Sequence, residues 1–465
     1  MATSSEFSRA HKVCVIIIVF LEYLLFSGII YGWADLVYVL KLQGVFSNNC
    51  NNNVTISGNE TIANKTKSCK SQDDLFDLAF TISSFNKALA AFLSGFLLDW
   101  VGLRITRIIS SCFILIGGTF LALCDKNNPY YLFPGSLLVG LGGSEIRYGN
   151  FQISNLFPKY KMTIMSFYNG AFCGSPAVLL LLKYCYDQGI SYSAFFYVWT
   201  GISSSILLTS FFLLPKMNII AVEDKEEIVR SINDDEERQP LLSRKSGESY
   251  KASTNNIFRS IFSISFIFHV VSNCLLALSI IIYLGSFNWW ITKLTSNQEE
   301  VSRLSEIFGF SQLPMIIVSP FIGILLDSAV KKAQEEEDPI LRKKKSQRAG
   351  FYSLIICSTV ATSMIACRTI SNVTAVYFSL VFYVLSRPIL NSVSPGYIRI
   401  RFPQEHFNKL IGIFGTVTCI SSVVQYPLFL WMQEDFMINN LFLIGLLALT
   451  FINPLHLLCL KPTDV

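Results

Sequence analysis

Charged residues are scarce in this chain. Lysine, arginine, aspartate and glutamate make up 15% of its 465 residues, whereas soluble domains carry about 25%. Hydrophobic residues make up 52%, and the mean hydropathy is +0.47. A water-soluble domain of this composition would expose large apolar patches and aggregate. The scarcity of charge therefore excludes an ordinary soluble protein and indicates a polytopic membrane protein.

Motifs of common enzymes and pumps are also missing. There is no Walker A sequence for an ATP-driven pump, and no HExxH or spaced Cys/His cluster for a metal. The basic run Arg342–Lys345 lies beside an apolar stretch, where anionic lipid is a better partner than nucleic acid. We therefore expect no enzyme activity, no cofactor, no metal site and no nucleic-acid partner.

Long hydrophobic runs are abundant. A membrane-spanning helix needs about 20 mostly apolar residues, and the chain contains twelve such stretches. They lie at about 13–35, 75–98, 105–124, 130–150, 162–184, 193–214, 259–284, 305–327, 349–367, 373–394, 409–431 and 437–459. The sequence therefore predicts an all-α polytopic membrane protein with twelve transmembrane helices.

The basic residues and the glycosylation sequences agree on one orientation. With the N-terminus inside, 25 of the 37 lysines and arginines are cytoplasmic and 9 are outside, which predicts that both termini are cytoplasmic. Loop 41–74 is then extracellular, and we expect it to be glycosylated and closed by a Cys50–Cys69 disulfide. The four N-x-[ST] acceptors all fall in outer loops: Asn53, Asn59, Asn64 and Asn372.

A polar segment divides the twelve spans six and six. We expect domains at 1–215 and 259–465, joined by a disordered cytoplasmic linker at 216–258. The linker run Glu237-Arg-Gln-Pro-Leu241-Leu242 resembles an acidic dileucine sorting signal that clathrin adaptors bind. The halves also repeat, because Gly95-Phe-Leu-Leu-Asp99 recurs as Gly323-Ile-Leu-Leu-Asp327.

The first copy of this repeat carries a family resemblance. Gly95-x-x-x-Asp99-x-x-Gly102-x-Arg104 resembles the loop signature of the major facilitator superfamily. The resemblance implies two six-helix halves that rock about a central site. Asp99 is expected to face a helix N-terminus and to pair with Arg104 and Arg107, forming a gate. The second copy, around Asp327, lacks the following glycine and arginine.

The spans contain a few ionisable side chains and several amides and aromatic rings. Amides and rings suit a neutral, planar substrate, although such residues also bond between helices. Glu22 and Arg387 could instead hold the ammonium and carboxylate of an amino acid. The ionisable residues that stand out within the spans are Glu22, Lys87, Glu145, Arg147, His269 and Arg387. The candidate substrate-binding residues are Glu22, Tyr168, Asn169, Phe172, Gln312, Arg387 and Gln425.

A closer resemblance is to the solute carrier 43 family. It rests on runs such as Ser166-Phe-Tyr-Asn-Gly-Ala-Phe172 and Phe402-Pro403-x-Glu-His406, and it is nearest the nucleobase transporter branch. It implies sodium-independent facilitated diffusion of purine nucleobases. Large neutral amino acids, proton coupling or a non-transporting receptor remain as alternatives. Plasma membrane is the expected location, with endosomal or lysosomal membrane as the alternative. Departures from the family pattern gather at Lys87, Glu145, Arg147 and Tyr148.

Overall fold

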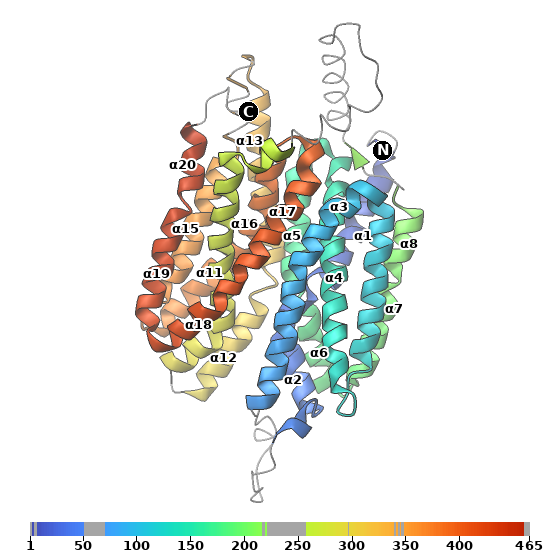
Figure 1. Ribbon diagram of the computed structural model, residues 1–465, viewed down its shortest axis with the longest axis vertical. Coiled ribbons are helices and arrows are strands. Elements are labelled where there is room, and N and C mark those ends of the chain that lie inside the picture. The colour runs from blue at the N-terminus through green and yellow to red at the C-terminus, as the bar shows by residue number, and fades with distance from the viewer. Residues whose placement is uncertain are drawn as a thin grey trace, which may run out of the picture. The chain divides into compact units, whose positions relative to one another are not determined.

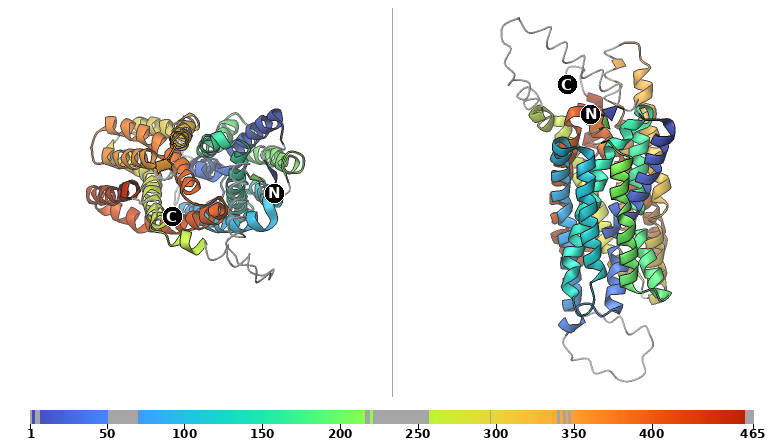
Figure 2. Two further views of the ribbon diagram at one scale, coloured as in Figure 1. Left: turned by 90° about the horizontal axis from the view of Figure 1, so that it is seen from above. Right: turned by 90° about the vertical axis from the view of Figure 1, so that its right-hand side faces the viewer.

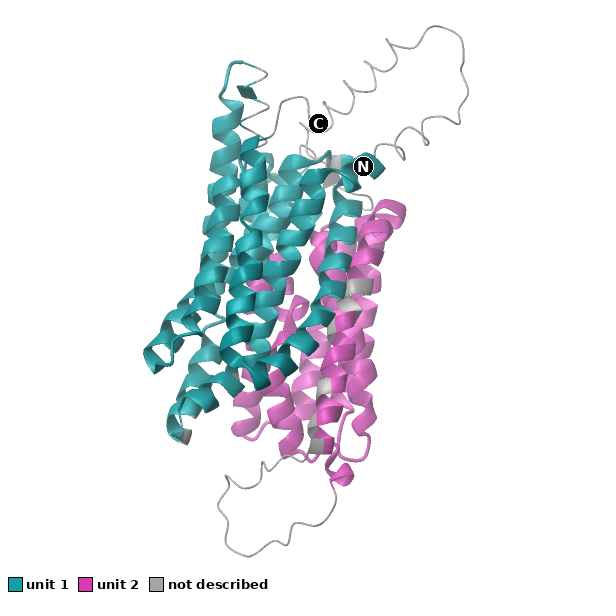
Figure 3. Cartoon of the chain, turned by 60° about the vertical axis from the view of Figure 1, so that its left-hand side comes forward, with its two compact units in different colours: residues 1–16, 151–170, 217–465 teal, residues 17–150, 171–216 magenta. Residues whose placement is uncertain are grey.

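The structure is a computed structural model. It describes residues 2–3, 7–50, 70–215, 219–220, 257–295, 297–338, 341–342, 345 and 348–459. The chain forms two compact units (Figure 3). Unit 1 holds residues 1–16, 151–170 and 217–465, and unit 2 holds residues 17–150 and 171–216. The predicted linker residues 221–256 lie outside the described residues.

Unit 2 consists of helices from the first part of the chain (Figure 1). They are α1 (Arg9–Glu22), whose beginning belongs to unit 1, η2 (Tyr23–Ser27), η3 (Ile29–Gly32), α2 (Trp33–Leu42), η4 (Ser47–Asn49), α3 (Lys70–Ala122), η6 (Pro129–Tyr131), α4 (Leu132–Asn150), α6 (Ala177–Asp187), α7 (Tyr192–Ser203) and α8 (Ser205–Phe212). Figure 2 shows α3 and α4 running lengthwise beside each other.

Unit 1 consists mainly of helices from the second part of the chain. They are η7 (Phe151–Leu156), η8 (Pro158–Tyr160), α5 (Lys161–Gly174), whose end belongs to unit 2, α11 (Ile264–Leu294), α12 (Gln298–Phe310), α13 (Met315–Gln334), α15 (Phe351–Cys367), α16 (Val373–Arg401), η9 (Gln404–His406), α17 (Phe407–Ser421), η10 (Ser422–Val424), α18 (Gln425–Glu434), α19 (Phe436–Leu449) and α20 (Ile452–Cys459). Two short strands, β1 (Ala2–Thr3) and β2 (Ile219–Ile220), pair in parallel, which the sequence did not predict.

Helices occupy every one of the twelve ranges predicted as spans. Among the described residues, eight helices are long and apolar enough to cross a membrane, and a ninth counts if the bent α12–α13 pair is one span. The number is lower than twelve because α3 merges two predicted spans, α15 has only 17 residues, and α4 is long enough but not apolar enough. Large apolar side chains such as Trp100, Phe212 and Ile317 are exposed, as a lipid-facing surface requires.

Gly102 interrupts α3 between the two predicted spans. Its φ of 79° and ψ of 175° are non-helical, and this region of conformational space is essentially restricted to glycine. The helical hydrogen bonds resume beyond it, and Thr106 donates its hydroxyl to the Gly102 carbonyl at 2.9 Å. The motif glycine therefore marks the turn that separates the second span from the third.

The first predicted span is not a continuous α-helix. After Glu22 the chain passes through a π-helical segment, η2, and a 3₁₀ segment, η3. Glycines permit the close packing around this break. A Cβ on Gly143 of α4 would lie 2.5 Å from the Phe26 carbonyl oxygen, and one on Gly28 would lie 2.5 Å from that of Phe172. Small residues of this kind let membrane helices approach closely.

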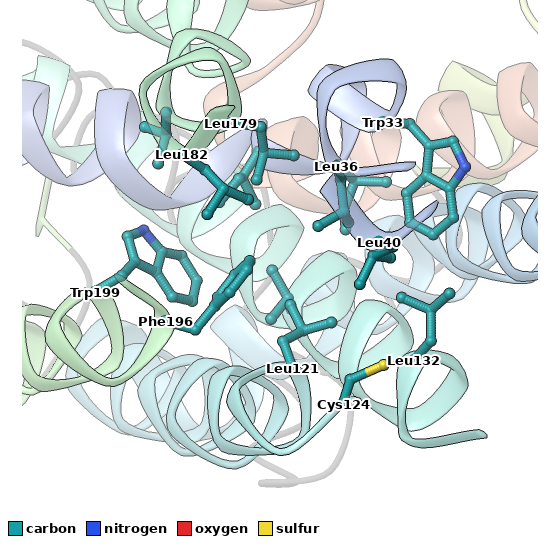
Figure 4. Close-up of a cluster of buried hydrophobic side chains, with 14 of the residues drawn as sticks. Trp33, Leu36, Leu40, Leu121, Cys124, Leu132, Leu179, Leu182, Phe196 and Trp199 are labelled. Atoms are coloured by element: carbon teal, nitrogen blue, oxygen red, sulfur yellow. The ribbon is translucent and has the colours of Figure 1, made fainter. Parts of the chain in front are cut away.

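A cluster of buried apolar side chains holds unit 2 together (Figure 4). The ring of Trp199 in α7 packs against the Phe26 ring in a tilted orientation, with ring centroids 5.4 Å apart. Its indole N–H donates to the Leu25 carbonyl at 3.0 Å. This bond satisfies one carbonyl beside the break in the first span. Figure 4 labels Trp33, Leu36, Leu40, Leu121, Cys124, Leu132, Leu179, Leu182, Phe196 and Trp199.

We predict that Gly102→Ala destabilises the protein by about 1–3 kcal/mol, because a residue with a Cβ atom is strained in this backbone conformation. The measurement is thermal unfolding of the detergent-purified protein. Gly201→Ala in α7 is the matched control, since a Cβ there meets nothing within 4 Å. An unchanged unfolding temperature for Gly102→Ala would show that the turn does not need glycine.

Candidate transport and gating sites

A buried ion pair lies in unit 2. Arg107 of α3 and Glu22 of α1 are 0% and 3% exposed. Both Glu22 carboxylate oxygens lie 2.8 Å from Nη2 of Arg107. The Thr209 hydroxyl donates to Glu22 at 2.7 Å, and Nε of Arg107 donates to Ser210 at 3.0 Å. Nη1 donates to the Asn150 side-chain oxygen. The pair thus joins α1, α3, α4 and α8.

This arrangement corrects one expectation. Arg107 was expected to pair with Asp99, but within the described residues it pairs with Glu22. The physical reason is that a carboxylate within the bilayer needs a counter-charge, and Arg107 is buried where Glu22 is. Asp99 lies on an exposed part of α3, while Gly95 is buried. Arg104 donates to the Leu214 carbonyl at 2.6 Å, just beyond α8.

The second copy of the motif caps a helix in unit 1. The Asp327 carboxylate accepts the backbone N–H groups of Met162 and Thr163 at 3.1 and 2.8 Å. It also accepts the Thr163 hydroxyl at 2.6 Å. These residues form the first turn of α5, whose positive dipole end favours an anion. An acidic side chain facing a helix N-terminus was expected of Asp99, and the structure shows this geometry at Asp327.

Small residues also let α13 and α5 pack closely against each other, along a contact that we call the seam. A Cβ on Gly323 would lie 2.4 Å from the Thr163 Cα atom, so only glycine fits there. One turn earlier, the Ser319 hydroxyl donates to the Ser166 carbonyl at 2.6 Å. A Cβ on Gly170 would lie 2.9 Å from the Ile316 carbonyl oxygen. The seam joins helices from the two predicted halves of the chain.

Most candidate substrate residues in unit 1 are buried. Gln312 accepts a hydrogen bond from Nη1 of Arg387 at 2.8 Å, and these side chains are 8% and 4% exposed. The structure therefore brings together two of the predicted residues. Tyr168 and Asn169 are fully buried in α5. Gln425 is half-buried at the start of α18.

Phe172, a second candidate residue in unit 2 besides Glu22, has an arginine over the face of its ring. The Arg147 guanidinium carbon lies 3.9 Å from the Phe172 ring centroid, in cation–π geometry. Tyr31 meets Phe172 edge-on, with centroids 5.5 Å apart and an interplanar angle of 84°. The sequence singled out Arg147 as a charge within a span, but gave it no role.

Two further polar contacts were missed from the sequence. Ser94 of α3 donates to the Glu145 carboxyl of α4 at 2.5 Å, in a buried position. In unit 1, Arg399 donates to Ser154 and Asn155 at 2.7 and 2.9 Å. The side chain of Lys87 lies outside the described residues. Glu145 was visible as a charge within a span, whereas Arg399 counted only toward the orientation.

Only some of the outer-loop and linker predictions fall on described residues. Cys50 is disulfide-bonded. The Asn372 side chain is exposed and accepts the Thr374 N–H at 2.9 Å, at the N-cap of α16. In the part of the chain that the structure describes, no three His, Cys, Asp or Glu side chains gather to hold a metal. The other predicted residues lie outside the described ranges: Asn53, Asn59, Asn64, Cys69, Glu237, Leu241 and Leu242.

Comparisons with known proteins agree with this architecture. The Major Facilitator Superfamily model matches residues 15–426. The chain is 28% identical to equilibrative nucleobase transporter 1 of Bos taurus, over 96% of each chain. It is 23% identical to large neutral amino acids transporter small subunit 3 of Homo sapiens, over 94% of this chain and 91% of the relative. A solved structure of the proton:xylose symporter XylE matches with a TM-score of 0.63 over 98% of both chains, at 14% identity.

The family match and the transporter relatives, together with the long apolar helices, define a polytopic membrane transporter, not an enzyme. The chain belongs to the Major Facilitator Superfamily. The predicted superfamily fold is thereby confirmed, and so is the resemblance to the solute carrier 43 family. The superfamily signature in the sequence, rather than the number of long apolar helices, was the more reliable guide to the fold.

We predict that Asp327→Ala lowers the free energy of unfolding by about 1–2 kcal/mol, because the first turn of α5 loses its cap. Asp327→Asn should lose less, since it keeps an acceptor oxygen. Thermal unfolding in detergent measures both. Glu335→Gln is the control, because Glu335 is an exposed acid at the end of the same helix. Equal stability of Asp327→Ala and Glu335→Gln would contradict the capping role.

Proposed function

We propose that this chain moves purine nucleobases (adenine, guanine and hypoxanthine) across a membrane by sodium-independent facilitated diffusion. The observation that carries the proposal is the similarity to equilibrative nucleobase transporter 1, which extends over 96% of both chains. An alternative is the transport of large neutral amino acids, which the 23% identity to large neutral amino acids transporter small subunit 3 supports.

The chemistry of the candidate residues favours the neutral substrate. Amides can bond the polar edge of a base, and aromatic rings can cover its faces. A free amino acid would need an acidic side chain to pair with its ammonium group and a basic side chain to pair with its carboxylate. Glu22, the acid proposed for that role, already faces Arg107 and Thr209. Glu22 is left out of the substrate contacts because its carboxylate pairs with Arg107. The substrate-binding residues in this proposal are Tyr168, Asn169, Phe172, Gln312, Arg387 and Gln425.

Transport in this proposal follows alternating access between the halves 1–215 and 259–465. Asp327 and Gly323 close one side by holding α13 against the start of α5. Gly95, Asp99, Gly102 and Arg104 form the corresponding gate in the first half, while Arg107 stays paired with Glu22. A gate made of helix caps and small residues can open without leaving a bare charge in lipid, because water reaches the helix ends.

The surroundings of the transporter follow from the same orientation. Both termini and the linker 216–258 are cytoplasmic, while loop 41–74 is extracellular, with a Cys50–Cys69 disulfide. Asn53, Asn59, Asn64 and Asn372 carry the glycans. The plasma membrane is the proposed location. Use of Glu237, Leu241 and Leu242 by a clathrin adaptor would divert part of the protein to endosomes or lysosomes.

We predict that cells expressing the chain take up radiolabelled adenine and hypoxanthine at the same rate with and without sodium. A change of external pH should not drive accumulation above the gradient. A tenfold excess of unlabelled leucine should leave uptake unchanged, because Glu22, the acid considered for its ammonium group, pairs with Arg107. Radiotracer uptake in expressing oocytes measures this, with non-expressing oocytes as the control.

Other outcomes select the alternatives. Leucine uptake without purine uptake would replace the proposal with the amino-acid alternative. Accumulation driven by a pH gradient would replace facilitated diffusion with proton coupling. If surface-expressed protein carries none of these compounds, a receptor or scaffold becomes the better account.

A further inference from the structure

An open cavity of about 390 Å³ lies among the loops of unit 2, and none of the candidate substrate-binding residues lines it. Its lining comes from Phe46, Asn48 and Asn49, which follow α2, and from Lys126–Tyr131, which connect α3 to α4. Both connections are extracellular in the proposed orientation. The volume lies in the range of about 300–1,000 Å³ that is usual for small-molecule sites. The cavity therefore faces the medium from which a transported molecule arrives.

One wall of the cavity is a strained aromatic residue. Phe46 has a φ of 60°, in the left-handed region, which is uncommon for a bulky side chain. Strain of this kind persists only where the surroundings hold it, and it clusters at ligand sites. The Phe46 ring is 2% exposed and meets the rings of Phe76, Tyr130 and Phe133 edge-on, with centroids 5.4, 5.7 and 6.2 Å away. The surrounding rings thus hold this wall in place.

A second wall is a turn with its own internal bonds. The Asp125 carboxylate accepts the backbone N–H groups of Asn127 and Asn128 at 3.0 and 2.7 Å, and the Asn128 side-chain amide at 3.3 Å. An aspartate that bonds the backbone two residues further on fixes a turn. Tyr131 packs edge-on against Phe120 of α3, with ring centroids 5.6 Å apart. Both walls are therefore preformed, and the Asp125 carboxylate is occupied within the turn.

The side chains that line the cavity suit a planar ring with a polar edge. Tyr130 and Tyr131 are 62% and 38% exposed, so their rings can cover the face of a ligand. The exposed amides of Asn49 and Asn127 offer both donors and acceptors to its edge. The described lining contains one lysine, Lys126, and no acidic side chain. A purine base meets these conditions, whereas the ammonium group of a free amino acid would lack a carboxylate partner.

We propose that this cavity is a second purine-binding site, on the outer face of the transporter and separate from the candidate transport residues. The inference rests on the proposed function, which supplies the ligand. Tyr130 stacks on the base, and Asn49 and Asn127 bond its polar edge. Lys126 donates to a ring nitrogen or to an exocyclic oxygen of the base.

Protection of an introduced cysteine tests the site in intact cells that express the full chain. Asn128→Cys places a thiol in the lining and keeps the backbone bonds to Asp125. It should react with a membrane-impermeant maleimide added outside, and hypoxanthine should slow the reaction. Gln188→Cys, in the exposed turn between α6 and α7, is the matched control. It should react equally well with and without hypoxanthine. The unmodified protein gives the background of the native cysteines.

Further substitutions in the Asn128→Cys chain test the contacts. Tyr130→Ala should raise the hypoxanthine concentration that gives half protection about fivefold or more, the size of one lost stacking contact. Tyr130→Phe should keep this concentration unchanged, because the ring remains. Lys126→Gln should raise it as well, and leucine should give no protection. Labelling without hypoxanthine shows that each variant reaches the cell surface.

Two results would overturn the inference. One is equal labelling of Asn128→Cys with and without hypoxanthine, in cells that take up hypoxanthine. This result would leave the proposed function intact. The other is protection that stays unchanged in both Tyr130→Ala and Lys126→Gln, because the protection would then arise outside the cavity. Failure of the proposed function looks different, since the same cells would take up no purine.

Discussion

The buried ion pair between Glu22 and Arg107 is the constraint on which unit 2 depends. Each of these charges alone would cost several kcal/mol in a low-dielectric interior. The two charges and their hydrogen-bond partners belong to α1, α3, α4 and α8, so the four helices must meet at this point. The next residue, Tyr23, begins the break in the first span and donates to the carbonyl of Arg147.

Unit 1 stabilises its acidic side chain differently. Asp327 has backbone and hydroxyl donors at the first turn of α5, where the helix dipole takes the place of a counter-ion. The close approach of the two helices needs Gly323, since any side chain would meet Thr163. A cap of this kind is formed by groups that water can also satisfy. This makes it suited to a contact that opens and closes, whereas the enclosed Glu22–Arg107 pair is suited to permanence.

The positions of helices and turns, which depend on local sequence, could be predicted. The contact partners of the charged side chains could not. Apolar runs located the helices, and the Gly102 motif located the turn within α3. The break at residues 23–32 was not predicted, because Ser27, Gly28 and Gly32 are common inside membrane helices and do not by themselves mark an interruption. Arg107 was placed beside Asp99 because they are close in sequence, yet its partner is 85 residues away. Arg147 stood out as a charge within a span, but its contact with the Phe172 ring forms only in the folded chain.

The central claim is that Glu22 is neutralised within the protein and leaves the transport site to a neutral substrate. A double-mutant cycle on Glu22→Gln and Arg107→Gln tests it most directly, with thermal stability and hypoxanthine uptake measured together. The account predicts that each single variant loses about 3–5 kcal/mol of stability, while the double variant recovers most of the stability and the uptake. A stable double variant without uptake, or single variants as stable as the unmodified protein, would contradict the account.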